Sequence, residues 1–406
     1  MYDKEILESH LAVIAQLTSY KYKDYDDNLG VLAGISGVAL FQFYYSKHTN
    51  NDYHADIGAE IITHCIEKIN TGFSHPSFCN GIAGLAWVIQ HLRKEGFIEL
   101  NSDDLLSQFD DFLYKKMIID FRENKYDFLH GALGYAFYFF KRFKETERVE
   151  LREKYQNILF FSISEMERLS TKDNNSVKWL SIIDPERNIS GYNLGAAHGM
   201  ANVLNFFSRL HHFEIFRKST KTILELGVKY MLTVQNKTAI GTSLFPNAII
   251  DGNSIQYKSR LAWCHGDLGI GISMIHVAEA LNSSSLMKNA LCILKHSAKR
   301  KKSEDTMVVD AGFCHGSYGN AHIYQAVNQR NPNKMFHESS KFWIQDGLKK
   351  AKFQDGYAGY KQMSGPEGNW APSISILEGV SGIGLVLIDL LSNKRNKWDE
   401  CLMIGK

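Results

Sequence analysis

The sequence is poor in proline and cysteine, carries almost no net charge and contains no long apolar run. Only 6 of its 406 residues are proline, far below the usual share of about 5%. Scarce proline leaves few obstacles to helix formation, and with an ordinary number of glycines, 31, it excludes collagen-like and Pro/Gly-rich low-complexity chains. Because 44% of the residues are hydrophobic, the chain can form a sizeable core, which excludes wholesale disorder.

Other absences exclude further classes of protein. The 46 basic residues are nearly balanced by 44 acidic ones, and a net charge of +2 does not suit a nucleic-acid-binding protein. No apolar run reaches the roughly 18 residues of a membrane span, so we expect no transmembrane segment, and the N-terminus lacks the basic start of a secretory signal. Six scattered cysteines are too few for a disulfide framework in so long a chain and indicate free thiols in a reducing cytoplasm.

One short pattern recurs seven times: a glycine, two further residues, a second glycine and then an apolar helical segment. It begins at Gly34, Gly81, Gly131, Gly199, Gly266, Gly316 and Gly379, at intervals of 47 to 68 residues. Only the fourth copy departs, with Asn202 at the second glycine position. Glycines three apart share one helix face, so we expect them to let neighbouring helices approach closely.

Each repeat combines an apolar segment with an amphipathic one. Segments such as Leu85–Leu92 are nearly apolar all round, which is typical of a buried helix, whereas Asp103–Phe121 and Arg148–Leu169 are amphipathic. Seven buried helices favour a closed ring, because an open solenoid needs polar-faced terminal caps. The sequence therefore predicts an all-α fold, an α/α toroid of seven helical hairpins with about fourteen helices. We expect a single domain over residues 1–406, with all seven glycine motifs at one end of its cavity.

Two segments interrupt the helical pattern, residues 171–192 and 236–257. Both contain β-branched runs beside turn signals, such as the Asp-Gly pair at 251 and 252. They also account for the two longest intervals between repeats. We expect them to form small β-containing extensions of the toroid.

Aligning the repeats on their first glycine brings metal-binding residue types into register. The position before that glycine holds Ala33, Asn80, His130, His198, His265, His315 and Glu378. Repeats five and six both read Cys-His-Gly, so Cys264 and Cys314 occupy the same place in adjacent hairpins. Thiolate and imidazole ligands together favour zinc. With three protein ligands, a zinc ion keeps a fourth coordination position for a reacting group, whereas four protein ligands make a structural site. The spacing leaves open whether His265 is a ligand as well as His315.

An open zinc site with two cysteine ligands suits the activation of a thiol. Two thiolates neutralise the charge of the metal, and zinc lowers the pKa of a further thiol, which then binds as a nucleophilic thiolate. Attack on carbon also needs a group that handles protons. We expect His198, His130, Asp127 and Arg260 at the same end of the ring, with His198 accessible because small residues flank it.

These motifs resemble those of the lantibiotic cyclases, the lanthionine synthetase C-like family, in its class I stand-alone type. The resemblance is carried by Arg260-Leu-Ala-Trp-Cys-His-Gly266, by Phe313-Cys-His-Gly316, by Ala197-His-Gly199 and by Asp127 ahead of His130-Gly131. The seven glycine repeats extend it across essentially the whole chain. The resemblance also implies a toroid with a β-containing extension.

The resemblance implies a zinc-dependent enzyme that cyclises a ribosomally made, dehydrated precursor peptide. Zinc held by Cys264, Cys314 and His315 would bind a cysteine thiol of this peptide. The thiolate would add to dehydroalanine or dehydrobutyrine in the same peptide, which gives a lanthionine or methyllanthionine ring. A separate dehydratase and an exporter are the implied partners, and the enzyme would be cytoplasmic or held at the membrane through a biosynthetic complex.

The resemblance also assigns the groups that handle protons. His198 would protonate the enolate, and Asp127 and Arg260 would support proton transfer and orientation. One departure concerns the residue after the first zinc cysteine, which is often tyrosine in the family and is His265 here. If His265 bound zinc, the site would be closed, so we expect it to act beside the metal or as an acid or base.

Two alternatives stay open from the sequence. One is another zinc-dependent thiol-alkylating enzyme, since protein prenyltransferase β-subunits are also α/α toroids, although their ligands include a carboxylate and they lack paired Cys-His-Gly loops. The other is a non-catalytic peptide- or glutathione-binding relative with a structural zinc. A bound metal without affinity for thiols would favour this second alternative.

Overall fold

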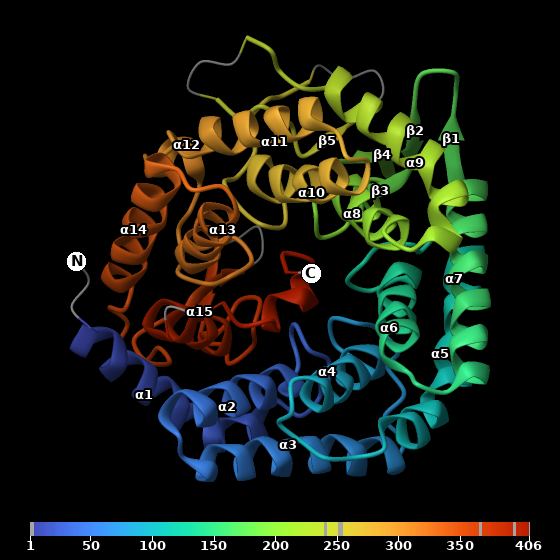
Figure 1. Cartoon of the computed structure of the whole chain (residues 1–406). Coiled ribbons are helices and arrows are strands. Elements are labelled where there is room, and N and C mark those ends of the chain that lie inside the picture. The colour runs from blue at the N-terminus through green and yellow to red at the C-terminus, as the bar shows by residue number, and fades with distance from the viewer. Residues whose placement is uncertain (1–3, 239–241, 251–254, 365–367, 393–394, 406) are drawn as a thin grey trace.

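The computed structural model describes residues 4–238, 242–250, 255–364, 368–392 and 395–405, and these form two concentric rings of helices (Figure 1). The inner ring holds the helices that follow the glycine motifs: α2 (Ile35–Thr49), α4 (Ile82–Lys94), α6 (Ala132–Glu145), α8 (Met200–His211), α10 (Asp267–Ala280), α13 (Ser317–Arg330) and α15 (Val380–Ser392). The outer ring holds α1 (Lys4–Lys21), α3 (Asp52–Asn70), α5 (Ser102–Arg122), α7 (Val149–Leu169), α9 (Glu214–Thr233), α11 (Ser284–Ser297) and α14 (Lys334–Lys349). The predicted α/α toroid of seven helical hairpins is confirmed.

The first helix of the chain closes the ring. Six inner helices pack against the outer helix that follows them, whereas α15, the last inner helix, packs against α1. Besides these fourteen helices, the described residues contain one more α-helix, α12 (Ser303–Thr306), and two 3₁₀ turns, Tyr22–Tyr25 and Trp398–Leu402. The seventh hairpin thus joins segments from opposite ends of the sequence.

The inner helices are buried on nearly all sides. In α4 every residue from Ile82 to Leu92 is buried, whereas in the outer helix α3 only Gly58, Ile61 and Cys65 are. This difference explains why the inner segments are apolar all round and the outer ones amphipathic. The hydrophobic core is therefore built around the inner helices, and each outer helix contributes only the face that it turns towards them.

Backbone hydrogen bonds join the glycine-motif loops at one end of the ring. They connect residues two positions before each first glycine: the N–H of Cys79 donates to Leu129 (2.9 Å), Ala197 to Cys264 (3.2 Å), Cys264 to Cys314 (3.4 Å), Cys314 to Leu377 (2.6 Å), Leu377 to Leu32 (3.0 Å) and Leu32 to Cys79 (3.2 Å). The remaining pair in this pattern is Leu129 and Ala197. Here the N–H of Leu129 donates instead to the side chain of Asp127 in its own loop (2.9 Å). The prediction that the motifs meet at one end of the ring is confirmed.

The second glycine of each motif makes room mainly for its own loop. A Cβ atom at Gly84, Gly269 or Gly319 would collide with the carbonyl oxygen of the residue six positions earlier. Gly84 also faces the neighbouring loop, because its Cβ would lie 2.6 Å from the backbone nitrogen of Val31. The expectation that these glycines serve the approach of neighbouring helices is therefore only partly right, since the nearest obstacle is the carbonyl of the same loop.

Short strands occur where the sequence predicts them and at one further place. The strand β1 (Ser170–Lys172) pairs with β2 (Val177–Trp179), and β3 (Ser181–Asp184), β4 (Ile189–Asn193) and β5 (Ala248–Ile249) form a second antiparallel sheet. The expected small β-containing extensions are confirmed, although residues 239–241 and 251–254 lie outside the described residues. The hairpin of β6 (Gln362–Ser364) and β7 (Asn369–Ala371) is not predicted by the sequence analysis.

Residues 395–405, here called the plug, lie in the middle of the ring, where Figure 1 marks the C-terminus. The plug includes the second 3₁₀ turn, and its residues from Trp398 to Gly405 are buried. Polar side chains of several inner helices bind its backbone, as Asn205 of α8 does at the carbonyl of Met403 (2.9 Å). The plug therefore fills the centre of the ring with protein.

Two features of the described residues concern the chain as a whole. All six cysteines are free thiols. None of the helices in the described ranges is long and apolar enough to cross a membrane.

Candidate metal centre

Two adjacent loops bring Cys264, Cys314 and His315 together. Their ligand atoms, the two Sγ atoms and one ring nitrogen, all lie within 4.8 Å of one another, and no other such group occurs in the part of the chain that the structure describes. Zn–S bonds of about 2.3 Å place two tetrahedral thiolate ligands about 3.8 Å apart. The donor types and their spacing therefore fit zinc with three protein ligands and one open position.

His265 and His315 take different places although both follow a cysteine and precede a glycine. The backbone explains this, because Gly266 has a φ of +77°, whereas Gly316 has a φ of −105°. The ring of His265 faces Gly195, where a Cβ atom would lie 2.8 Å from His265 Nδ1. His265 is therefore not part of the three-ligand group, and the positive φ makes glycine a requirement at position 266.

Asp310 orients His315. Its Oδ2 atom lies 3.1 Å from Nε2 of His315 and also accepts the backbone N–H of Met363 in β6 (3.3 Å), while Oδ1 accepts the N–H of Gly312 (3.1 Å). With Nε2 bound to a carboxylate, Nδ1 is the ring nitrogen left for a metal, as in many metal-bound histidines. The sequence analysis does not single out Asp310, although it stands four residues before Cys314, as Arg260 stands four before Cys264.

Hydrogen bonds within this group shift the pKa values of its two thiols in opposite directions. Hydrogen bonds from Cys314 and His315 lower the pKa of Cys264, whereas the bond to Cys264 and burial raise that of Cys314. Burial alone would lower the pKa of His315, but its bonds with Asp310 and Cys264 raise it to about 10. A metal that binds these ligands must therefore displace protons, because thiolates and a neutral imidazole nitrogen are the coordinating forms.

Asp127 and His198 form a second polar pair at the same end of the ring. Asp127 Oδ1 lies 3.1 Å from His198 Nδ1 and also accepts the backbone N–H groups of Leu129 (2.9 Å) and His130 (3.0 Å). Burial alone would lower the pKa of His198, but the hydrogen bond and charge of Asp127 raise it. Because Asp127 binds Nδ1, Nε2 of the half-exposed His198 ring is free to exchange protons. The ring of His130 stacks on the ring of His198, with their centroids 5.9 Å apart.

Two further charged residues stand at this end of the ring. Arg260 is partly buried, and within the described ranges its guanidinium has no hydrogen-bond or ion-pair partner. Burial lowers the pKa of His265, and the charges of His198 and Arg260 lower it further. Glu378, the seventh residue in the aligned register, was not predicted as a site residue, and burial raises its pKa while the nearby His315 opposes this shift.

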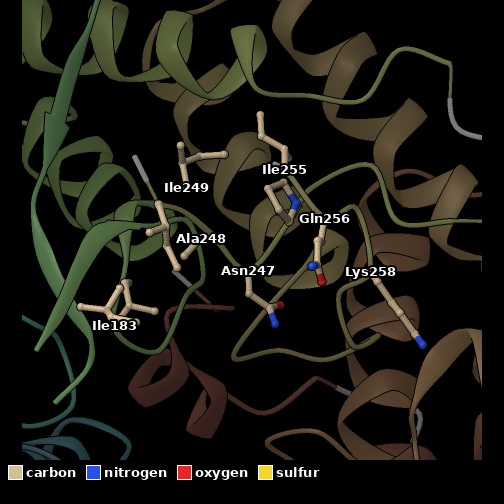
Figure 2. A pocket seen from close by; sticks show the side chains of 10 residues that line it. Ile183, Asn247, Ala248, Ile249, Ile255, Gln256 and Lys258 are labelled. Carbon is tan, nitrogen blue, oxygen red and sulfur yellow. The ribbon is translucent and has the colours of Figure 1, made fainter. Parts of the chain in front are cut away.

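A pocket of about 370 Å³ lies on the β-containing extension (Figure 2). It is lined by the apolar side chains of Ile183, Ile249 and Ile255 and by the polar side chains of Asn247 and Lys258. None of the predicted site residues lines it. This pocket is therefore separate from the metal-binding group.

Comparison with known proteins assigns the chain to a family. A family model described as lanthionine synthetase C-like protein matches residues 25–403. The chain belongs to this family. It is 24% identical over 345 residues to the nisin biosynthesis protein NisC of Lactococcus lactis subsp. lactis, which covers 79% of each chain. The solved structure of nisin cyclase matches with a TM-score of 0.76 at 18% identity, over 99% of this chain and 98% of that one, and so has the same fold.

Proposed function

We propose that this lanthionine synthetase C-like protein is a zinc-dependent peptide cyclase. It adds cysteine thiols of a dehydrated precursor peptide to dehydroalanine or dehydrobutyrine of the same peptide, which forms lanthionine or methyllanthionine. The observation that supports the proposal is the group of Cys264, Cys314 and His315, whose three donor atoms suit zinc and would leave a fourth position for a substrate thiol. The names of its relatives, a nisin biosynthesis protein and a nisin cyclase, agree with this activity.

The three ligands would hold zinc at the end of the ring where the glycine motifs meet. When bound there, zinc lowers the pKa of a coordinated thiol, so that the thiol is a thiolate near neutral pH. Cys264 and Cys314 contribute two negative charges, which makes the site better suited to a thiolate nucleophile than to the activation of water. Asp310 keeps the ring of His315 in place during the reaction.

The reaction is an addition whose atoms balance within the peptide. The thiol loses its proton, the sulfur forms a bond to the β-carbon of the dehydroamino acid, and the π electrons of the C=C bond move towards the α-carbon and the adjoining carbonyl. A proton then joins the α-carbon, so the mass of the peptide does not change. We assign this last proton transfer to Nε2 of His198, because Asp127 holds Nδ1 and raises the pKa of the ring.

Arg260 and His265 have supporting roles in the same reaction. The guanidinium of Arg260, which has no hydrogen-bond or ion-pair partner among the described residues, can bind the carbonyl oxygen on which negative charge develops, which stabilises the enolate. Burial keeps His265 largely neutral near pH 7, so it can accept or pass on the proton that leaves the substrate thiol. Neither role requires His265 to bind the metal.

The substrate chemistry also indicates the partners. A dehydratase must first remove water from serine or threonine side chains of the precursor, because only dehydrated residues accept the thiolate. The resemblance to the lantibiotic cyclases implies a second partner, an exporter that takes up the cyclised product. We propose that the enzyme works in the cytoplasm, either free or held at the membrane by these partners.

Metal content measured in single variants tests the site. We expect about one zinc per chain in the wild type and in His265→Ala, and loss of zinc in Cys264→Ala, Cys314→Ala and His315→Ala. Full zinc content in either cysteine variant would contradict the proposed ligand set. Loss of zinc in His265→Ala would show a closed, structural site and would favour a non-catalytic relative.

A further inference from the structure

The plug binds the inner ring from within through buried polar contacts. The Glu400 carboxylate pairs with Lys141 (2.6 Å) and Lys144 (3.0 Å) of α6, and His322 of α13 lies 2.9 Å from the carboxylate of Asp399. The backbone carbonyl of Met403 accepts a hydrogen bond from Asn205 of α8 (2.9 Å). Because so many partners fix it, the plug is a rigid element rather than a loose tail.

Both cysteines of the metal-binding group follow an aromatic residue that contacts the plug. Trp263 precedes Cys264, and its indole N–H donates to the carbonyl of Leu402 (3.0 Å). Phe313 precedes Cys314, and its ring meets the ring of Trp398 edge-on, with centroids 5.6 Å apart. All four contacting residues are almost completely buried, at 1% exposure or less.

Besides the plug, a side-chain hydrogen bond from Asn320 of α13 to the carbonyl of Leu261 (3.0 Å) and two backbone hydrogen bonds join the two repeats at this point. The N–H groups of Trp263 and Cys264 share the carbonyl of Cys314, at 3.1 Å and 3.4 Å. The second of these hydrogen bonds is long for an amide and contributes little. A shared contact with one rigid element would hold the loops at a set distance, and ligand separation decides how well a tetrahedral metal fits.

We propose that the plug positions Cys264 and Cys314 for zinc through Trp263 and Trp398. This inference rests on the proposed zinc site and assigns the plug a task beyond filling the centre of the ring. Trp263 and Trp398 do not touch the metal or the substrate, so they are positioning residues. Preorganised ligands bind a metal more tightly than ligands that must first be ordered.

The variant Trp263→Phe tests the proposal because it removes the indole N–H, together with the five-membered part of the indole, and keeps a six-membered aromatic ring. A matched control is Trp179→Phe in β2, since Trp179 is also fully buried and its indole N–H also donates to a backbone carbonyl, that of Met166 (2.7 Å). We expect the zinc dissociation constant of Trp263→Phe to rise about 10-fold, the lower end of the effect of supporting residues on metal affinity. The constant for Trp179→Phe should stay within about twofold of the wild type.

Cobalt spectra of the same variants separate positioning from stability. Cobalt bound by two thiolates and one imidazole reports distorted geometry through its visible bands, so Trp263→Phe should alter the spectrum and Trp179→Phe should not. Trp398→Leu should act in the same direction as Trp263→Phe. Equal zinc affinity and equal spectra in Trp263→Phe and Trp179→Phe would overturn the proposal.

Failure of this inference and failure of the zinc site give different results. If zinc binds to Cys264→Ala as well as to the wild type, the proposed ligand set is wrong, and with it the basis of the inference. If Cys264→Ala loses zinc but Trp263→Phe binds it normally, only the role of the plug is wrong.

Discussion

Replacing Asp310 with asparagine tests how the metal-binding histidine is held. Oδ2 of the buried Asp310 accepts hydrogen bonds from His315 (3.1 Å) and from the backbone of Met363 (3.3 Å), and Oδ1 accepts one from Gly312 (3.1 Å). All three partners are donors when His315 binds a metal through Nδ1. An asparagine amide would therefore place its NH₂ group against a donor in either orientation.

The expected loss of zinc affinity follows from these contacts. Removal of a group that orients a metal-binding histidine typically weakens metal binding about 10- to 100-fold. Because the amide also faces donors, we expect the upper part of this range for Asp310→Asn, about 30- to 100-fold. This corresponds to about 2.0 to 2.7 kcal/mol, at 1.36 kcal/mol for each factor of ten.

Competition with a chromophoric chelator measures the zinc dissociation constant directly. The matched control is Asp346→Asn, because Asp346 lies on the outer helix α14 and its carboxylate binds Ser317 (2.6 Å) and Lys350 (2.6 Å) rather than a metal ligand. We expect the control to change the constant by less than about twofold. A wild-type constant in Asp310→Asn would refute the role given to this carboxylate.

Three further predictions concern proton transfer and the plug. His198→Gln should keep its zinc but cyclise about 10²- to 10⁴-fold more slowly, and wild-type rates in a thiol-consumption assay would exclude His198 as the acid. Asp127 raises the pKa of His198, and the protonated form of a general acid disappears as the pH rises through its pKa. In Asp127→Asn the fall in rate on the alkaline side should therefore begin at a lower pH than in the wild type. A pH–rate profile identical to that of the wild type would contradict this. Glu400→Gln removes a buried ion-pair partner of Lys141 and should lower the free energy of unfolding, measured in urea, by about 3 kcal/mol. The control Lys397→Met removes the more exposed ion pair with Glu95 and should lower it by less than about 1 kcal/mol. Burial alone would raise the pKa of Glu400, but the charges of Lys141 and Lys144 lower it, so its contribution is present above the unfolded pKa of about 4.3 and is lost at lower pH. Equal effects of both variants would show that the buried pair stabilises the fold no more than the exposed pair does.

The ring could be predicted from the sequence because burial acts on every residue of an inner helix. Helices such as α4 are apolar all round, and the glycine motifs mark where each one starts. The pairing of α1 with α15 is not visible in this pattern, because it joins residues more than 350 positions apart and depends on closure of the ring. The β6–β7 hairpin was missed because its strands, Gln362–Ser364 and Asn369–Ala371, contain no β-branched residue.

The metal-binding group could also be predicted, because repeats in register place equivalent residues side by side. Cys264 and Cys314 meet as the alignment of the repeats indicates. The alignment does not separate His265 from His315, because their neighbours are the same and only the φ angle of the following glycine differs. The plug could not be predicted from the sequence either, because it contacts several inner helices that are far away in the sequence. Some of these contacts use backbone carbonyls such as that of Met403, and others use side chains such as Glu400.

The most direct test of the proposed function combines a mass measurement with a thiol count on one reaction. The zinc-loaded protein is incubated with a dehydrated peptide that carries dehydrobutyrine and cysteine, and the product is then treated with a thiol-alkylating reagent. We expect a peptide of unchanged mass that no longer takes up the reagent, at a rate well above that with zinc-free protein or with His198→Gln. A peptide that remains fully alkylated after incubation with the zinc-loaded wild type would contradict the assignment as a cyclase.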